Sequence, residues 1–322
     1  MKSSVTELPL IKMPAAMIGG CVGTSNVLAG QLFDVPVMGT HAHSWIMSFE
    51  DEYTAFKTYA DMYPDNCTLL VDTYDTLKSG VPNAIRAFNE VLRPMGISKC
   101  GIRLDSGDMA YLSQKARKML DEAGWPECQI SVSNSLDERL IQNLFLQGAQ
   151  IDMFGVGERM ITAKSEPVFG GVYKLTAVEN EQGEIIPKIK CSENVEKITI
   201  PHFKKVYRLY NKDNGKAIAD YMTVYDEVVD ENEPMMLFDP YATWKTKNVC
   251  NYQARELLVP VFLKGKKVYE SPALKDIQTY CKQQVDTLWD EIKRFDNPQT
   301  YYVDLSQKLW DIQQELLRKN RN

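Results

Sequence analysis

The sequence has little histidine, no closely paired cysteines and no long apolar run. Its 322 residues include only three histidines and seven cysteines, and no two cysteines form a C-x-x-C pair. Seven widely spaced cysteines fit neither a disulfide framework nor a zinc site, and they indicate a reducing cytoplasm. Residues 1–18 lack the apolar core and cleavage site of a signal peptide. No later run approaches the roughly eighteen apolar residues of a membrane span, so we expect no membrane partner.

An excess of positive charge is also missing. The formal net charge of -6 argues against nucleic acid as the main partner. Hydrophobic residues make up 44% of the chain and charged residues 25%, which is ordinary for a soluble globular protein. The length allows roughly two domains, each with its own core. The composition therefore predicts a soluble enzyme or scaffold.

Two of the three histidines lie in residues 39–45, GTHAHSW, directly after the apolar run 35–38. A short apolar run is typical of a buried parallel strand, which would put His41 and His43 at the carboxyl end of that strand. Proteins of the α/β class bind their ligands at such ends. The alternative is that both imidazoles are satisfied polar groups beneath a loop.

Short β-branched runs alternate with amphipathic segments up to about residue 179, which predicts a parallel sheet or barrel. The expected strands are residues 35–38, 68–71, 99–103, 129–132, 151–154 and 171–178. Ser135 and Glu138 have the spacing of a capping box that opens a helix.

The pattern changes beyond residue 179. Asn214-Gly215 lies between two strand-like runs and predicts a type I′ hairpin. We therefore expect an α/β barrel carrying the active site over residues 1–179, antiparallel strands of a smaller α/β domain over 180–234, and a mainly helical segment over 235–322. In that last segment, one helix is expected to start at Ser271-Pro272 and another at Asp304.

Polar or glycine-containing turns follow the expected strands. They are residues 72–75 (DTYD), 103–108 (RLDSGD), 133–135 (SNS) and 155–157 (GVG). Carboxylates at strand ends can hold ribose hydroxyls or Mg²⁺, and glycine-rich turns offer backbone N–H groups to a phosphate. Together the turns predict a sugar-phosphate site. The alternative is that Asp75 and Asp108 are favourable charges at helix N-termini and that G-V-G is an ordinary tight turn.

Six motifs, in this order and spacing, resemble the nicotinate phosphoribosyltransferase family. They are GTSNVLAG (23–30), GTHAHSW, LLVDTYDTLKSGVPNAI, GIRLDSGDMAYLS, SNSLDE and FGVGERMITA. The resemblance begins near residue 19 and continues into the C-terminal segment, ending in NPQTYYVDLSQKLW.

The resemblance implies an irregular, TIM-like α/β barrel of the type II phosphoribosyltransferase kind, with a smaller α/β portion and C-terminal helices. It also implies a reaction in which nicotinate and phosphoribosyl pyrophosphate give nicotinate mononucleotide and pyrophosphate, coupled to ATP hydrolysis, in NAD salvage. ATP and Mg²⁺ are the implied cofactors. A cytoplasmic homodimer with a shared pocket is the implied assembly.

The resemblance further assigns roles to single residues. Catalytic roles fall to His43, which would be transiently phosphorylated by ATP, and to Asp72 and Asp105, near the ribose or metal. Substrate-binding roles fall to Arg103 near the pyridine carboxylate, to Gly155 and Gly157 near the 5-phosphate, and to Asn134 and Ser25. The carboxylates that bind Mg²⁺ stay unassigned.

Physical chemistry supports these roles. The C1 carbon of the sugar becomes cationic as pyrophosphate leaves, and nearby carboxylates stabilise that charge. Imidazole is a competent nucleophile at neutral pH. In a strand-like stretch His41 would face away from His43, so we expect a structural role for His41.

Ser25 bears on the choice of substrate. The related enzyme that uses nicotinamide is similar here but carries a carboxylate at this position. A serine hydroxyl can donate to the carboxylate of nicotinate, whereas an aspartate would repel it. The alternative is that Ser25 only caps the turn.

Family members are usually much longer at the N-terminus, where further residues complete the pyridine pocket. One alternative function is therefore a catalytically silent fragment that acts as a partner subunit of a full-length enzyme. Another is an unrelated barrel lyase that acts on sugar phosphates without ATP.

Overall fold

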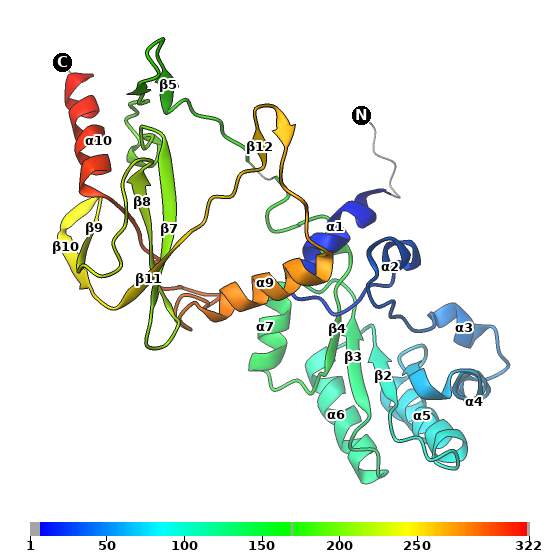
Figure 1. Ribbon diagram of the computed structural model, residues 1–322. Helices are drawn as coiled ribbons and strands as arrows, with labels where there is room; N and C mark the ends of the chain where they lie inside the picture. Colours follow the sequence, from blue (N-terminus) through cyan, green and yellow to red (C-terminus); the bar gives the residue numbers. More distant parts are fainter. Residues whose placement is uncertain (1–6, 169, 321–322) are drawn as a thin grey trace. The chain divides into compact units, whose positions relative to one another are not determined.

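The computed structural model describes residues 7–168 and 170–320 (Figure 1). The chain divides into two compact units, with the boundary between residues 169 and 170. The boundary that we expected after residue 179 therefore lies about ten residues too late. In the described part of the chain, no helix is long and apolar enough to cross a membrane.

The first unit is an α/β structure with a parallel sheet, as predicted (Figure 1). Its strands pair in the order β1-β2-β3-β4, and all described pairs are parallel. The strands are β1 (Thr68–Leu70), β2 (Gly101–Leu104), β3 (Gln129–Ser133) and β4 (Met153–Gly155). These four strands are consistent with part of an irregular barrel, and closure of that barrel stays a prediction.

Helices precede, connect and follow these strands. The α-helices are α1 (Glu7–Ile18), α2 (Val27–Phe33), α3 (His43–Met47), α4 (Glu52–Met62), α5 (Val81–Ala87), α6 (Met109–Glu122), α7 (Glu138–Leu146) and α8 (Glu158–Ile161). Shorter turns are η1 (Pro64–Asn66) and the π-helical turns η2 (Thr76–Gly80) and η3 (Phe88–Leu92), which flank α5.

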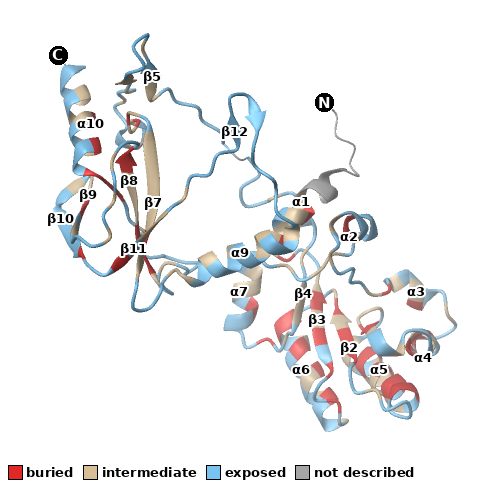
Figure 2. Cartoon of the chain, in the orientation of Figure 1, coloured by how far each residue is buried: buried red, intermediate tan, exposed pale blue. Residues whose placement is uncertain are grey.

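The core of the first unit lies between the sheet and its helices. Leu69, Ile102 and Ile130 on three adjacent strands are fully buried, and Phe88 and Leu120 from the connecting segments belong to the same cluster. Figure 2 shows the buried residues gathered on β2, β3 and the helices beside them. Burial on both faces explains why these strands read as continuous apolar runs.

Two of the predicted strands are wrong. In residues 35–38, only Val37 makes a strand contact, an isolated parallel bridge to Thr24. Pro36 has no N–H to donate, and Val37 is 49% exposed, so this run is not a buried strand. In residues 171–178 the only strand residues are the first two of β5 (Ala177–Glu179), which pairs with β6 (Ile185–Pro187) in the second unit.

The capping-box prediction is also wrong. Asp137 is the N-cap of α7, and its side chain accepts a hydrogen bond from the backbone N–H of Leu140. Aspartate and serine are about equally favourable N-caps, so Asp137 can take the position that the sequence pattern gave to Ser135. Ser135 instead adopts a left-handed backbone conformation in the preceding turn.

The second unit is built on a four-stranded sheet with the order β11-β7-β8-β14. Its strands are β7 (Lys204–Asn211), β8 (Ala217–Val224), β11 (Tyr252–Glu256) and β14 (Val303–Leu305). The second unit also contains two further hairpins and the short turn η4: β9 (Met235–Asp239) with β10 (Ala242–Val249), β12 (Phe262–Leu263) with β13 (Lys266–Lys267), and η4 (Val195–Lys197).

The predicted hairpin between β7 and β8 is confirmed. The predicted type I′ turn is wrong, because only Gly215 has a positive φ and that turn needs two such residues. The side chain of Asn211 accepts hydrogen bonds from the backbone N–H groups of Asp213 and Asn214 instead.

Residues 235–322 differ from the mainly helical segment that we expected. As far as the structure describes them, to residue 320, they contain six strands and two helices, α9 (Leu274–Asp286) and α10 (Gln307–Lys319). Helix α9 begins after its N-cap Ala273, two residues later than expected, and ends at Asp286. Helix α10 begins after its N-cap Ser306, whereas Asp304 lies in β14. Asp304 and Leu305, which we expected at the start of a helix, instead pair with β8 as part of β14.

The buried carboxyl of Asp304 should make the folded state less stable as the pH rises, which is the opposite of the usual effect of a carboxyl group. The residue is 4% exposed, and its Oδ1 has no partner among the described residues. Burial, with a smaller contribution from Asp239, raises the pKa of Asp304 to about 6. The folded state therefore binds this proton more tightly than the unfolded chain does. The resulting stabilisation is complete below about pH 3.9 and is lost as the pH rises through 6.

Asp304→Asn should remove this loss. We expect the variant to be about 1–3 kcal/mol more stable than the wild type at pH 7.5, with little difference near pH 4. Urea unfolding at both pH values measures this, and Asp276→Asn on the exposed first turn of α9 is the control. Equal stability of Asp304→Asn and wild type at pH 7.5 would contradict the prediction.

Candidate functional site

His43 lies against two strand-end carboxylates in the first unit. It is the first residue of α3, and its ring reaches the ends of β1 and β2. Its Nδ1 lies 2.9 Å from Thr73 Oγ1. Its Nε2 lies 3.7 Å from Asp105 Oδ2 and 4.0 Å from Asp72 Oδ1. One nitrogen of the imidazole thus contacts a hydroxyl, while the other nitrogen is directed at two acids.

Asp72 is a buried acid with one unused oxygen. Its side chain is only 1% exposed. Oδ2 accepts hydrogen bonds from the backbone N–H of Asp105 (3.0 Å) and from Ser106 Oγ (2.5 Å). Oδ1 has no hydrogen-bond partner among the described residues. Because a buried carboxylate is costly without a counter-charge, this oxygen is suited to a cation.

Asp105 is held in its ionised form. Burial opposes ionisation, but hydrogen bonds from Ser133 and Arg103 outweigh it and lower the pKa of Asp105 below its ordinary value. Oδ1 takes both of those hydrogen bonds, from Ser133 Oγ and from Arg103 Nη2. Oδ2 is left directed towards His43. At neutral pH the site therefore presents a carboxylate to the imidazole.

Arg103, on β2, forms hydrogen bonds to three side chains of the site. Its Nε donates to Ser133 Oγ (2.8 Å), Nη1 to Thr40 Oγ1 (2.9 Å) and Nη2 to Asp105 Oδ1 (2.9 Å). A guanidinium has five N–H groups, so, as far as the described residues are concerned, one on each Nη is left for a ligand. The guanidinium is thereby fixed in position and still able to bind an anion.

His41 takes the structural position that we expected. It is buried, its Nε2 accepts a hydrogen bond from the backbone N–H of Leu70 (3.2 Å), and its ring meets the edge of Tyr59. Burial lowers the pKa of His41 to about 4, so the ring is neutral at pH 7. It joins the GTHAHSW segment to β1.

The glycine turns lie along the same edge of the sheet. Gly155 ends β4 and is in register with Ser133, and a Cβ on Gly155 would lie 3.2 Å from the Ser133 Cβ. Gly157 precedes α8, and a Cβ there would meet open space. Asn134 lies between these strands in a left-handed conformation (φ 87°) and is exposed. The parallel register therefore places Asp105, Ser133 and Gly155 side by side at this edge.

Ser25 is exposed and follows Thr24, which pairs with Val37 just before GTHAHSW. It is not the cap of the following helix, because Asn26 accepts the hydrogen bond from the backbone N–H of Ala29. A helix-capping role thus falls to Asn26, and the role of Ser25 in substrate choice stays a prediction.

Two other acids, Asp75 and Asp108, lie at helix N-termini, which is the alternative to a ligand-binding role. Asp75 accepts hydrogen bonds from the backbone N–H groups of Leu77 and Lys78, and Asp108 accepts one from Tyr111. Both are helix N-caps. Among the described residues there is no group of three or more acids, histidines or cysteines that could hold a metal by itself.

Sequence reasoning missed the hydroxyls that hold the site. Thr40, Thr73, Ser106 and Ser133 each bond to a side chain named above. The only feature of the sequence that points to these four residues is their position in the turns that follow the strands.

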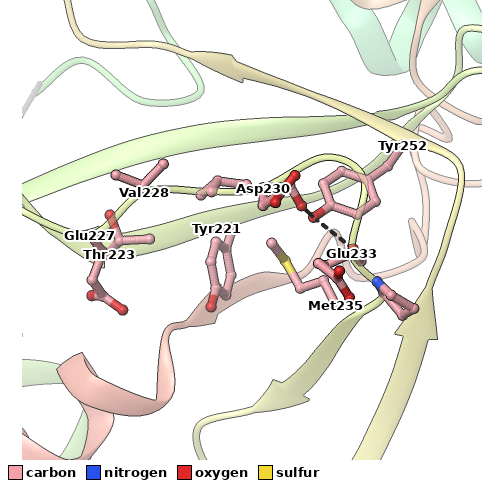
Figure 3. A pocket seen from close by; sticks show the side chains of 10 residues that line it. Tyr221, Thr223, Glu227, Val228, Asp230, Glu233, Met235 and Tyr252 are labelled. Carbon is pink, nitrogen blue, oxygen red and sulfur yellow. Dashed lines mark hydrogen bonds between the residues drawn. The ribbon is translucent and has the colours of Figure 1, made fainter.

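A hollow in the second unit has a different character (Figure 3). The Tyr252 hydroxyl there donates to the backbone carbonyls of Asp230 (2.7 Å) and Glu233 (3.3 Å). Glu227 accepts from the backbone N–H of Val224 and from Ser306 Oγ. These polar groups stabilise the loop between β8 and β9, so we assign no chemistry to the hollow.

Comparisons with known proteins agree with the motifs. The profile described as "Nicotinate phosphoribosyltransferase (NAPRTase) family" matches residues 2–197, and that of "Nicotinate phosphoribosyltransferase C-terminal domain" matches residues 203–313. The chain is 50% identical to nicotinate phosphoribosyltransferase of Bacillus subtilis over 92% of its own length and 60% of that protein. Against the protein of that name from Dictyostelium discoideum, identity is 33%, over 91% of this chain and 58% of the relative.

A solved structure gives the same result. The crystal structure of human nicotinic acid phosphoribosyltransferase matches with a TM-score of 0.72 and 26% identity, over 98% of this chain and 69% of that one. The chain spans about 60% of the length of the curated relatives named above. On both profiles and the Bacillus identity, the chain belongs to the nicotinate phosphoribosyltransferase family.

Proposed function

We propose that this chain forms nicotinate mononucleotide and pyrophosphate from nicotinate and phosphoribosyl pyrophosphate, coupled to ATP hydrolysis. The observation that carries the proposal is the geometry of His43, whose Nε2 is directed at Asp72 and Asp105. The Bacillus subtilis and Dictyostelium discoideum relatives are named for the phosphoribosyl transfer to nicotinate. We further propose a cytoplasmic homodimer as the working form.

His43 is the proposed phosphoacceptor. Its Nε2 attacks the γ-phosphorus of ATP, so that an N–P bond forms while the bond from phosphorus to the bridging oxygen breaks and ADP leaves. The phosphate later passes to water. The role needs an unprotonated Nε2, and Nδ1 is the nitrogen engaged by Thr73.

Asp72 and Asp105 are the proposed residues for a cation and for the sugar. Oδ1 of Asp72 and Oδ2 of Asp105 both face the same nitrogen, and Asp72 Oδ1 is buried without a partner. These oxygens fit Mg²⁺, which binds through one or two carboxylates together with phosphates and water. When bound, Mg²⁺ would neutralise charge on the phosphates and on the leaving pyrophosphate. The carboxylates also stabilise positive charge at C1.

Substrate choice is proposed to rest on Ser25 and Arg103. The two unused N–H groups of Arg103 can bind a carboxylate, and the Ser25 hydroxyl can donate to one as well. Gly155, Gly157 and Asn134 lie along the sheet edge that would receive the 5-phosphate. These groups favour an anionic pyridine over an amide.

The test follows product formation by the purified chain. Nicotinate, phosphoribosyl pyrophosphate and MgATP should give nicotinate mononucleotide, whereas nicotinamide should react at least about a hundredfold less efficiently. Omitting ATP should slow the reaction. Absence of product, equal use of nicotinamide, or consumption of the sugar phosphate without nicotinate and ATP would contradict the proposal.

A further inference from the structure

Thr73 is the side chain in hydrogen-bond contact with the His43 ring. It follows Asp72 directly, just beyond the end of β1, and its Oγ1 lies 2.9 Å from His43 Nδ1. The distances from His43 Nε2 to the two acids, 3.7 and 4.0 Å, are too long for hydrogen bonds. The orientation of the ring therefore depends on the Thr73 hydroxyl.

The Thr73 backbone is itself firmly placed. The backbone N–H of Val71 donates to the Arg103 carbonyl, which continues the pairing of β1 with β2. Asp72 is held by the backbone of Asp105 and by Ser106. On the other side, Gly80 packs so closely on Val71 that a Cβ would lie 1.8 Å from the Val71 carbonyl oxygen. A hydroxyl on such a segment can define the direction of a neighbouring ring.

The direction of this hydrogen bond decides which nitrogen can react. Neutral imidazole carries its proton on one nitrogen only. If Thr73 accepts a hydrogen bond from Nδ1–H, the lone pair of Nε2 is free on the side of Asp72 and Asp105. If Thr73 donates to Nδ1, the proton resides on Nε2 and blocks it as a nucleophile.

We propose that Thr73 is a positioning residue for His43: its Oγ1 accepts the hydrogen bond from Nδ1–H, which turns an unprotonated Nε2 towards Asp72 and Asp105. The inference rests on the proposed role of His43 as phosphoacceptor. Thr73 touches neither ATP nor the sugar in this account. It acts through the tautomer and the orientation of the ring.

Three variants separate this role from a structural one. Thr73→Val keeps the shape of the side chain and removes the hydroxyl, whereas Thr73→Ser keeps the hydroxyl. Thr58→Val is the control, because it removes a threonine hydroxyl that donates to the Thr54 carbonyl on α4. Thermal unfolding of all three checks that each variant is folded.

The first measurement is side-chain ¹⁵N NMR of the unphosphorylated protein with Mg²⁺ present. With only three histidines in the chain, the His43 signals can be assigned by comparison with His43→Gln. Wild type, Thr73→Ser and Thr58→Val should show His43 as the Nδ1–H tautomer. Thr73→Val should show a mixture or the Nε2–H tautomer. Wild type in the Nε2–H form, or a Thr73→Val spectrum equal to wild type, would overturn the proposal.

The second measurement is the single-turnover rate of γ-phosphate transfer from ATP to the protein. Thr73→Val should lower the maximal rate about tenfold or more with little change in the ATP concentration for half-maximal rate, and Thr73→Ser should restore most of it. Thr73→Val at the wild-type rate, or Thr73→Ser as slow as Thr73→Val, would overturn the proposal. A wild type that takes no phosphate would defeat the proposed function instead, and the NMR comparison would still decide the role of Thr73.

Discussion

His43→Ala is expected to lose the ATP-dependent part of the activity and to take no phosphate from ATP. With ATP present, kcat/KM should fall at least about a hundredfold, which corresponds to about 2.7 kcal/mol of transition-state stabilisation. The physical reason is that alanine removes the imidazole that faces both Asp72 and Asp105. Steady-state rates with and without ATP measure the effect.

His202 supplies the matched control. It lies in the second unit, where its Nδ1 contacts the backbone of Phe203 and its half-buried ring stacks on Tyr225. His202→Ala should retain both the ATP-dependent rate and the phosphate uptake. An ATP-stimulated rate in His43→Ala equal to that of the wild type would contradict the role given to His43.

Asp72→Asn should lower kcat/KM about 10²–10³-fold while leaving the folded protein intact. The substitution removes the charge but keeps an oxygen that can accept from the Asp105 backbone and Ser106. Without Mg²⁺ the variant should be as stable as the wild type or more stable, because an unpaired buried charge has been removed. Thermal or urea unfolding with and without Mg²⁺ tests this independently of activity.

Mg²⁺ should stabilise the wild type and have little effect on Asp72→Asn. At about 100 times Kd, a ligand that binds only the folded state adds about 2.7 kcal/mol. Asp75→Asn is the control, because Asp75 only caps η2 and asparagine caps equally well. An unchanged Mg²⁺ effect in Asp72→Asn would exclude Asp72 as the residue that holds the cation.

The sequence predicted those strands whose own residues are enough to identify them. The runs that became β1, β2 and β3 are buried on both faces and therefore show continuous apolar character. Residues 35–38 form a similar apolar run but are not buried. Whether such a run becomes a strand depends on the neighbouring segments that can pair with it and cover it. The short strand β14 exists because β8 offers a partner, which no local pattern at Asp304 reveals.

The candidate site divides in the same way. The acids Asp72 and Asp105 stand out as carboxylates that directly follow apolar runs, and parallel register then brings them together. The supporting hydroxyls do not stand out, because each partner is distant in the sequence. Thr73 is 30 residues from His43, and Thr40 is 63 residues from Arg103. A threonine in a turn is too common to be assigned a role before the fold is known.

Identification of the phosphorylated residue tests the central claim most directly. The purified chain is incubated with γ-labelled ATP and Mg²⁺, quenched in alkali to preserve phosphohistidine, and digested for mass spectrometry. We predict a single labelled site at His43, no label in His43→Ala, and loss of the label when phosphoribosyl pyrophosphate and nicotinate are added. A wild type without label, or a label on any other residue, would contradict the account.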